Sequence, residues 1–426
     1  MAELLDCDTA GGQAPLHWCP MPNAIFAAPI LSENAARVIG AAARLEGVRL
    51  GVVTQDPIER LPEPLRGGVA QHWRVADVLD LEQLAGAVEA VAERLGGVDC
   101  LFAAYEQLQV PIALVRERLG VEGMSADAAR NFRDKARMKE LFDAAGLPCA
   151  RHARVTSADD AWRFVEANGY PVVIKPLEGA GAKSTFRVDT AEQLADALRV
   201  APPPLLIEEH IVGEEHSFEG VMVDGSLIWH SLTHYRPTPL EVLRNGWIQW
   251  CIHLPRETDA SRYDDIRAAA ARALEVLGMK TGLCHLEWFR RRDGSIAISE
   301  VAARPPGAQI MDLVSYAHDI DFDAAWVRLM ILGTFEPTVP QWSAGIAFLR
   351  GQGQGLVNAR VKALHRVEEA AAAVGSLVVA ARLPSIGQPP SGSYEGEGFI
   401  IVRDRETAVV GRALETIINL IHVELG

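Results

Sequence analysis

Residues 169–185, GYPVVIKPLEGAGAKST, combine a strand pattern, a lysine and a loop with almost no side chains. The β-branched residues 172–174 suit a strand that is buried within a sheet. Lys175 follows them directly, and its ammonium would be costly to bury unless an anion met it where the strand ends. The glycines and alanines at 179–182 allow successive backbone N–H groups to close around phosphate oxygens. The stretch predicts a phosphate site, with a tight turn as the alternative, and it lacks the GxxxxGK(S/T) spacing of a Walker loop.

The size and charge of the chain limit its architecture and its partners. With 426 residues and 49% hydrophobic composition it exceeds one hydrophobic core, so two or more domains are expected. The 41 basic and 56 acidic residues give a net charge of −15, which argues against a nucleic-acid partner. An acidic N-terminus and the lack of a long apolar run argue against a signal peptide and a membrane partner, so we expect a cytoplasmic protein. The cysteines have no CxxC pair, which favours reduced, packed thiols without a chemical role.

The first 120 residues alternate strand and helix patterns. NAIFAAPI, VRLGVVT and VDCLFAAY have strand character, and a helix is predicted from Ser32 as N-cap to Gly47 as C-cap. This order predicts a small open α/β sheet of parallel strands. The first strand is not followed by GxGxxG, which argues against an NAD or FAD site.

Two glutamates further along the chain form a second candidate site. Glu287 and Glu300 lie on strand-like segments joined by an Arg-Asp-Gly turn, a hairpin spacing that can bring both carboxylates together. Mg²⁺ is bound in proteins by one or two carboxylates together with substrate phosphates. The alternative is that both glutamates face solvent on one side of a strand. Arg304, four residues after Glu300, is a candidate to reach the same phosphates or a substrate carboxylate.

Five motifs in this order resemble the ATP-grasp superfamily. They are a lysine in a charged helix (SADAARNFRDKARMKELFDAAG), KP before a small-residue loop, IEEHIVGEE, HLE, and EVAARPPG. The resemblance covers residues 120–335 and implies a fold of mixed α/β and α+β class with a Rossmann-like N-terminal domain. It implies domains at 1–120, 121–210 (lid and first nucleotide lobe) and 211–335 (metal and substrate lobe), with an appended β-rich C-terminal domain at 336–426.

The resemblance also assigns roles to individual residues. Two lysines and the small-residue loop would bind phosphates, the IEEHI segment would meet adenine, and a following glutamate would accept the ribose hydroxyls. Glu209, like Glu214, is better explained as a solvated charge. The implied nucleotide-binding residues are Lys135, Lys175, Gly179, Gly181, Ser184, Glu208, Glu209, Ile211 and Glu215; the implied metal ligands are Glu287 and Glu300; and the implied catalytic residues are Arg304 and Gly307.

The reaction implied is the formation of an amide through an acyl phosphate, with ATP and Mg²⁺, or Mn²⁺ in its place, as cofactors. A substrate carboxylate would take the γ-phosphoryl group, and an amine would then displace phosphate. Many members carry Asn where this chain has Ala302, which removes one contact near the second metal position. Water can fill such a vacancy on Mg²⁺. His285 is a candidate to support the metal ligands from behind.

Within the superfamily the chain looks most like the subgroup of L-amino-acid ligases and carnosine-synthase-like enzymes. That subgroup implies small-molecule substrates, amino acids that are joined into a dipeptide, and a homodimer. The segment HYRPTPLEVLRNGWIQW, with Tyr235, Arg236, Trp247 and Trp250, lies where a substrate loop would fall. A biotin-carboxylase-like enzyme and a non-catalytic ATP-binding regulatory protein are the alternatives.

Overall fold

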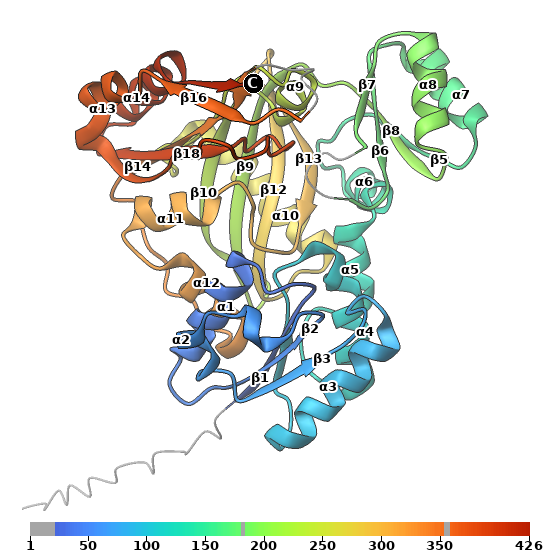
Figure 1. The fold of residues 1–426 in the computed structure, drawn as a ribbon. Coiled ribbons are helices and arrows are strands. Elements are labelled where there is room, and N and C mark those ends of the chain that lie inside the picture. The colour runs from blue at the N-terminus through green and yellow to red at the C-terminus, as the bar shows by residue number, and fades with distance from the viewer. Residues whose placement is uncertain (1–21, 180–183, 353–357) are drawn as a thin grey trace, which may run out of the picture.

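The computed structural model describes residues 22–179, 184–352 and 358–426 of the chain (Figure 1). Four parallel strands in the order β3-β2-β1-β4 form the N-terminal sheet, which confirms the predicted open α/β arrangement. Its helices pack on both sides, and α3 covers the side lined by Ile25 and Val53. The elements are β1 (Asn23–Ala28), α1 (Glu33–Ala43), β2 (Arg49–Thr54), α2 (Glu63–Arg66), β3 (Gln71–Arg74), α3 (Leu81–Leu95), β4 (Cys100–Phe102) and α4 (Gln109–Leu119).

The first helix starts as predicted but ends earlier. The Ser32 hydroxyl accepts a hydrogen bond from the backbone N–H of Ala35 at 3.2 Å, so Ser32 is the N-cap. The helix ends at Ala43 rather than beside Gly47. The backbone N–H of Leu45 bonds the carbonyl of Ala42, which tightens the chain into a turn before Gly47. Gly47, with φ of 79°, then redirects the chain into β2.

The charged segment predicted as one helix forms two, α5 (Ala126–Arg133) and α6 (Lys135–Ala144). Asp134 separates them with an extended backbone conformation, and its carboxylate accepts hydrogen bonds from the N–H groups of Ala136 and Arg137. Asp134 is therefore the N-cap of α6. The break places Lys135 at the first position of a helix, where its side chain is buried, rather than on a solvated helix face.

A four-stranded antiparallel sheet follows in the order β5-β8-β6-β7, at the upper right of Figure 1. The buried residues Val172 and Ile174 on β6 pack beneath the two helices of this lobe, as their β-branched pattern predicts. The strand ends at Pro176, so Lys175 lies at the edge of the apolar core. The elements are β5 (His152–Val155), α7 (Ala158–Asn168), β6 (Val172–Pro176), β7 (Phe186–Val188), α8 (Ala191–Val200) and β8 (Leu205–Glu209).

The largest sheet has eight strands in the order β13-β12-β9-β10-β11-β14-β18-β17, and every pairing is antiparallel. Its last three strands come from the C-terminal region. That region therefore extends the central sheet instead of building a sheet wholly of its own. The elements are β9 (Gly213–Val223), β10 (Ser226–Arg236), α9 (Pro239–Arg244), β11 (Trp250–Leu254), α10 (Asp264–Leu277), β12 (Gly282–Arg291), β13 (Ile296–Ala302), α11 (Ile310–His318), α12 (Phe322–Leu332), β14 (Ser343–Leu349), β17 (Val378–Arg382) and β18 (Gly398–Asp404).

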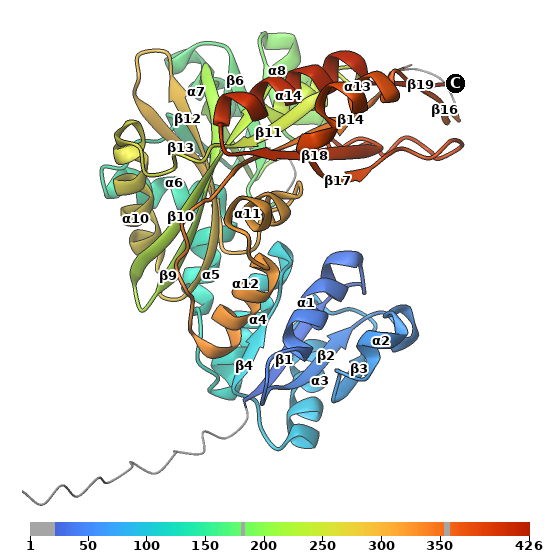
Figure 2. The ribbon, with the colours of Figure 1, turned by 90° about the vertical axis from the view of Figure 1, so that its left-hand side faces the viewer.

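A small sheet in the order β15-β19-β16 lies beside the final helices. Figure 2 shows α12 between the N-terminal sheet and the central sheet, and α12 contacts both β4 and β12. One hydrophobic core accordingly includes Phe102 of the N-terminal sheet, Trp326 of α12 and Ile252 of the central sheet. No helix in the described residues is long and apolar enough to span a membrane. The remaining elements are β15 (Gly351–Gln352), β16 (Val361–His365), α13 (Val367–Val374), α14 (Thr407–Leu420) and β19 (His422–Leu425).

Candidate active site

A cavity of about 780 Å³ lies where the lid sheet (β5 to β8) meets the central sheet. This volume is typical of a small-molecule or cofactor site. The structure brings most of the predicted site residues to its wall. Ser184 is exposed and does not line the cavity, although its neighbour Thr185 does. Gly181 lies outside the described residues. The predicted residues on the wall are Lys135, Lys175, Gly179, Glu208, Glu209, Ile211, Glu215, Glu287, Glu300, Arg304 and Gly307.

The two predicted metal-ligand glutamates face each other across a hairpin. Glu287 on β12 and Glu300 on β13 are direct register partners, joined through a turn in which Gly294 has φ of 87°. A shift in register between Glu287 and Trp288 accommodates one extra residue on β13. The prediction that the hairpin brings both carboxylates together is confirmed, because they are paired and both line the cavity.

Each of these carboxylates has a cationic or protonatable neighbour. Lys135 Nζ lies 3.1 Å from Glu300 Oε1 and also donates to the carbonyl of Gly179 at 2.9 Å. His285 Nε2 lies 3.6 Å from Glu287 Oε1, and its Nδ1 is 2.9 Å from a carboxylate oxygen of Glu219. Burial lowers the pKa of His285, but the two carboxylates outweigh burial and raise it to about 9. The His285 ring is therefore held between two carboxylates, behind the paired glutamates.

Glu219 is buried completely and completes this arrangement from β9. Its carboxylate accepts a hydrogen bond from the Ser217 hydroxyl at 2.7 Å, and that hydroxyl is 2.5 Å from the hydroxyl of Thr233. A buried carboxylate with such partners fixes the ring that it contacts. Glu219 thus orients His285, and through His285 it orients Glu287.

Lys175 meets an anion at the end of its strand, as its sequence position requires. Lys175 Nζ lies 2.6 Å from Glu208 Oε1, and Lys139 Nζ lies 3.0 Å from Glu208 Oε2. The side chains are 13%, 7% and 1% exposed for Lys175, Glu208 and Lys139. Burial raises the pKa of Glu208, but the two lysines outweigh it and lower that pKa to about 2. Glu208 is therefore an ionised carboxylate shared by the buried ammonium group of Lys139 and the largely buried one of Lys175.

Glu215 lies among like charges in the cavity wall. Glu215 on β9 is buried, and its pKa is raised well above its usual value by burial and by the charges of Glu287 and Glu300. A divalent cation near the paired glutamates, or hydroxyl donors at Glu215, would relieve this repulsion. The carboxylate-rich donor set fits a hard cation such as Mg²⁺, which prefers oxygen ligands.

Arg304 is fixed from the N-terminal domain. Its Nε donates to Glu106 at 3.0 Å and its Nη1 donates to the carbonyl of Pro305 at 2.8 Å. Glu106 is 4% exposed and also pairs with Arg133 at 2.5 Å. The guanidinium therefore lies on the cavity wall, as does Gly307. The two residues after Gly307, Ala308 and Gln309, have left-handed backbone conformations with φ of 52° and 59°.

Aromatic side chains close another part of the wall. Tyr235 and Trp250 line it from the predicted substrate segment, and their rings are 5.7 Å apart. Tyr394, from the Gly- and Pro-rich segment before β18, packs edge-on against Trp250 at 4.9 Å and lines the cavity as well. Arg236 is exposed and off the wall, and Trp247 is 61% exposed, so neither of these predicted substrate residues lies at the cavity.

Four side chains at or behind the wall were not assigned from the sequence: Glu106, Lys139, Glu219 and Tyr394. Lys139 lies four residues after Lys135, so the same helix face was a usable signal. Glu219 interrupts the apolar strand SFEGVMV, and an acid within such a run is a signal of a buried pair. Glu106 and Tyr394 gave no signal, because their positions depend on contacts between distant parts of the chain: Glu106 contacts Arg304 behind the wall, and Tyr394 packs against Trp250.

Comparison with known proteins agrees with this geometry. Residues 140–312 match the ATP-grasp domain family. Alanine–anticapsin ligase of Bacillus subtilis (strain 168) is 25% identical over 279 residues, which cover 59% of this chain and 58% of that protein. L-arginine-specific L-amino acid ligase of Bacillus subtilis is 23% identical over 285 residues, which cover 65% of this chain and 67% of that protein. The crystal structure of L-amino acid ligase from Bacillus licheniformis aligns with a TM-score of 0.74 at 19% identity, over 94% of this chain and 98% of that chain.

The chain therefore contains an ATP-grasp domain, and its architecture is the ATP-grasp fold with a Rossmann-like N-terminal domain. The resemblance inferred from the five motifs is confirmed. Among the proteins it is similar to, amino acid ligases appear both by sequence and by structure. The chain spans only about 58% of the length of alanine–anticapsin ligase, so this similarity does not establish the activity of that protein for this chain.

Proposed function

We propose that this chain is an ATP-dependent carboxylate–amine ligase that forms an amide through an acyl phosphate and releases ADP and phosphate. One observation carries the proposal: the register pair Glu287 and Glu300 shares a single cavity with the cations Lys135, Lys175 and Arg304. Carboxylates and cations facing one cavity suit a metal-bound polyphosphate, since phosphoryl transfer depends on positioning and charge neutralisation.

ATP is the cofactor that this wall suits. Lys135 and Lys175 would contact its phosphates, and Gly179, whose carbonyl accepts from Lys135, lies on the wall beside them. The segment from Glu208 to Ile211 would meet the adenine ring. Glu215 would accept from the ribose hydroxyls, which a carboxylate can do with both oxygens.

Glu287 and Glu300 would hold Mg²⁺. A metal ion held there would supply charge neutralisation for the transferred phosphoryl group. Ala302, which is 2% exposed and lines the same wall, offers no side-chain oxygen or nitrogen at the place where many members have Asn. Water would complete the metal coordination there.

The other residues of the wall would orient the reactants and exclude water. Arg304, fixed by Glu106, would hold the substrate carboxylate or the phosphate of the acyl phosphate. Gly307 and the amino-terminal end of α11, where Ile310 lines the cavity, would present backbone N–H groups to the same anion. Tyr394 would shield the acyl phosphate from water on the side of the C-terminal segment.

An amino acid is the proposed carboxylate substrate, and a second amino acid the proposed amine. The names of the relatives support this class, and the aromatic wall of Tyr235, Trp250 and Tyr394 would pack against one side chain of the product. The product would then be a dipeptide or a related amide.

The test is incubation of the purified chain with Mg²⁺, ATP and a pool of amino acids, with ADP, AMP and new condensed masses measured by mass spectrometry. ADP together with a new amide mass is the expected result. Glu300→Gln is expected to abolish both signals, whereas Glu214→Gln, on a carboxylate whose side chain is 81% exposed, should retain them.

Three outcomes would contradict the proposal. AMP as the product would contradict the acyl phosphate, and ADP release that requires bicarbonate and biotin would indicate a biotin-carboxylase-like reaction. ATP that binds but is never consumed with any substrate pair would indicate a non-catalytic role.

A further inference from the structure

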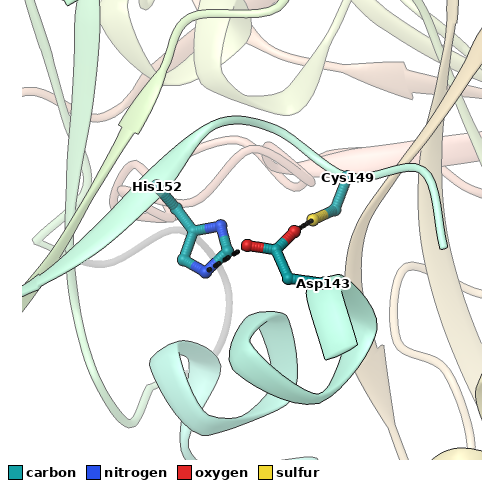
Figure 3. A group of neighbouring side chains, drawn as sticks. All are labelled: Asp143, Cys149 and His152. Atoms are coloured by element: carbon teal, nitrogen blue, oxygen red, sulfur yellow. Dashed lines mark hydrogen bonds and ion pairs between the residues drawn. The ribbon is translucent and has the colours of Figure 1, made fainter. Parts of the chain in front are cut away.

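Three potential metal ligands lie together outside the cavity wall, where α6 passes into β5. Figure 3 shows the side chains of Asp143, Cys149 and His152 converging, and one ligand atom from each lies within 4.8 Å of the others. Cys149 Sγ is 3.4 Å from Asp143 Oδ1, and His152 Nε2 is 3.7 Å from Asp143 Oδ2. The site is open to solvent through Asp143, whose side chain is 66% exposed, while His152 is 5% exposed.

The contacts of the His152 ring indicate which of its two nitrogens faces the other ligands. Its Nδ1 lies 3.0 Å from the carbonyl oxygen of Ala150, which can only accept a hydrogen bond, so Nδ1 carries a proton. In the neutral ring Nε2 then presents a lone pair, and this lone pair faces a carboxylate oxygen at 3.7 Å. A nitrogen lone pair and a carboxylate oxygen that face each other repel unless a cation lies between them, and either a ring proton or a metal ion can be that cation. A metal-binding histidine typically donates its other ring N–H to a backbone carbonyl in this way.

The separations leave room for one ion between the three side chains. The sulfur lies 3.4 Å from one oxygen of Asp143, and the histidine nitrogen lies 3.7 Å from the other oxygen. The exposed carboxylate therefore spans the two donors, and one ligand atom of each residue lies within the 4.8 Å that a shared ion allows. We propose that Asp143, Cys149 and His152 bind a zinc-class divalent cation, with water as its fourth ligand.

The donor set separates this site from the proposed Mg²⁺ site. A thiolate and an imidazole select zinc-class ions, whereas Glu287 and Glu300 offer oxygen alone. Burial raises the pKa of the Cys149 thiol to about 12, so without a cation the group is an unreactive thiol. Binding would release the thiol proton to solvent and form the sulfur–metal bond, which makes affinity rise with pH. The sequence-based prediction that the cysteines have no chemical role would then be wrong for Cys149.

The backbone connects this cluster to the cavity. Ala150, between two of the ligands, lines the cavity, and Arg151 exchanges backbone and side-chain hydrogen bonds with Glu209. His152 is the register partner of Glu208. A bound cation would therefore fix the strand beside the segment proposed to meet adenine, although the site itself does not depend on the proposed function.

The experiment is titration of the reduced, untagged, metal-free protein with Co²⁺, which reports thiolate ligation as charge-transfer absorption in the near ultraviolet. We expect absorption that saturates at one equivalent, disappears on addition of Zn²⁺ and is unaffected by excess Mg²⁺. Cys149→Ser should remove it, and Asp143→Asn should weaken Co²⁺ binding by about tenfold or more. Because Asp143 is largely exposed, its variant is expected to remain folded even if the cysteine variant does not.

Two controls separate this site from others in the chain. The double variant Cys7→Ser with Cys19→Ser removes the cysteines near the N-terminus, and Glu300→Gln alters the proposed Mg²⁺ site. Both should keep the absorption unchanged. The absence of charge-transfer absorption at one equivalent in the wild type, or its persistence in Asp143→Asn at wild-type affinity, would overturn the proposal.

Discussion

Replacement of Glu208 by Gln is predicted to destabilise the protein by about 3 kcal/mol. Two observations lead to this value. A pKa lowered from 4.5 to about 2 corresponds to about 3 kcal/mol in favour of the ionised carboxylate. Removal of one partner from a buried ion pair typically costs about 3 to 5 kcal/mol, because it leaves an uncompensated buried charge. Here Gln would leave Lys139, which is 1% exposed, without an anion.

The assay is urea denaturation followed by tryptophan fluorescence and by circular dichroism, with coincident transitions required before a single free energy of unfolding is used. Glu209→Gln is the matched control, because that neighbouring side chain is 21% exposed and pairs with arginines near the surface. We expect it to cost less than about 1 kcal/mol. The double variant Glu208→Leu with Lys139→Met should be more stable than Glu208→Leu alone, since it removes the stranded cation.

The same carboxylate should make stability depend on pH in acid. The folded pKa of Glu208 is lowered, so its contribution is complete above the unfolded value and is lost as pH falls through about 2. Between about pH 4.5 and 2 the wild type should therefore lose about 3 kcal/mol that Glu208→Gln never had, and the two stability curves should converge. A variant that lies within 1 kcal/mol of the wild type at neutral pH, or curves that remain parallel in acid, would refute the shared ion pair.

Three further changes test the walls of the cavity. Glu219→Gln should raise the Mg²⁺ concentration needed for ATP consumption by about tenfold or more, because it loosens the His285 ring behind the paired carboxylates. The affinity for ATP measured without Mg²⁺ should not change. Glu106→Gln should lower kcat by about tenfold, since Arg304 loses a charged hydrogen bond worth about 1.5 kcal/mol or more, with ATP affinity unchanged in a calorimetric titration. Tyr394→Ala should raise the KM of the amino-acid substrate and increase ATP hydrolysis without amide formation, whereas Trp247→Ala, at an exposed position, should do neither.

The hairpin that carries Glu287 and Glu300 was predictable because its information is local. An Arg-Asp-Gly turn between two alternating segments sets the register, and the register sets which residues face each other. The β-branched run before Lys175 is equally local, and it predicted both the strand and the position of the lysine at the end of that strand. Such patterns predicted which residues of these segments the structure brings to the cavity.

Other features depend on contacts that no local pattern contains. Glu219 and His285 are 66 residues apart, and Glu106 and Arg304 are 198 apart, so their pairing exists only after the sheets have assembled. The break at Asp134 was missed because Asp lies within a run of good helix formers. Only the two hydrogen bonds that its carboxylate accepts from the next turn reveal it as a cap. The C-terminal strands likewise show their β-character in sequence but not their partner, β11 of the central sheet.

The charge pairs of the cavity lead to a last prediction, that ATP and Mg²⁺ bind cooperatively. In this structure Lys135 pairs with Glu300 at 3.1 Å and Lys175 pairs with Glu208 at 2.6 Å. A polyphosphate that attracts Lys135 would leave Glu300 without its cation, beside Glu287 and beside Glu215, whose pKa is already raised by burial and by both carboxylates. Mg²⁺ would relieve that repulsion, so each ligand improves the site for the other.

Calorimetric titration of ATP with Mg²⁺ and with excess EDTA measures this coupling. We expect the wild type to bind at least about fivefold more tightly with Mg²⁺, a lower bound for coupled sites. Mg²⁺ also changes ATP in solution, so the decisive quantity is the ratio of the two affinities in Glu300→Gln relative to the wild type. The ratio should fall towards one in Glu300→Gln and remain at the wild-type value in Glu214→Gln. An unchanged ratio in Glu300→Gln would show that the lysine and the metal do not compete for this carboxylate, and that the cavity neutralises the phosphates and the acids independently.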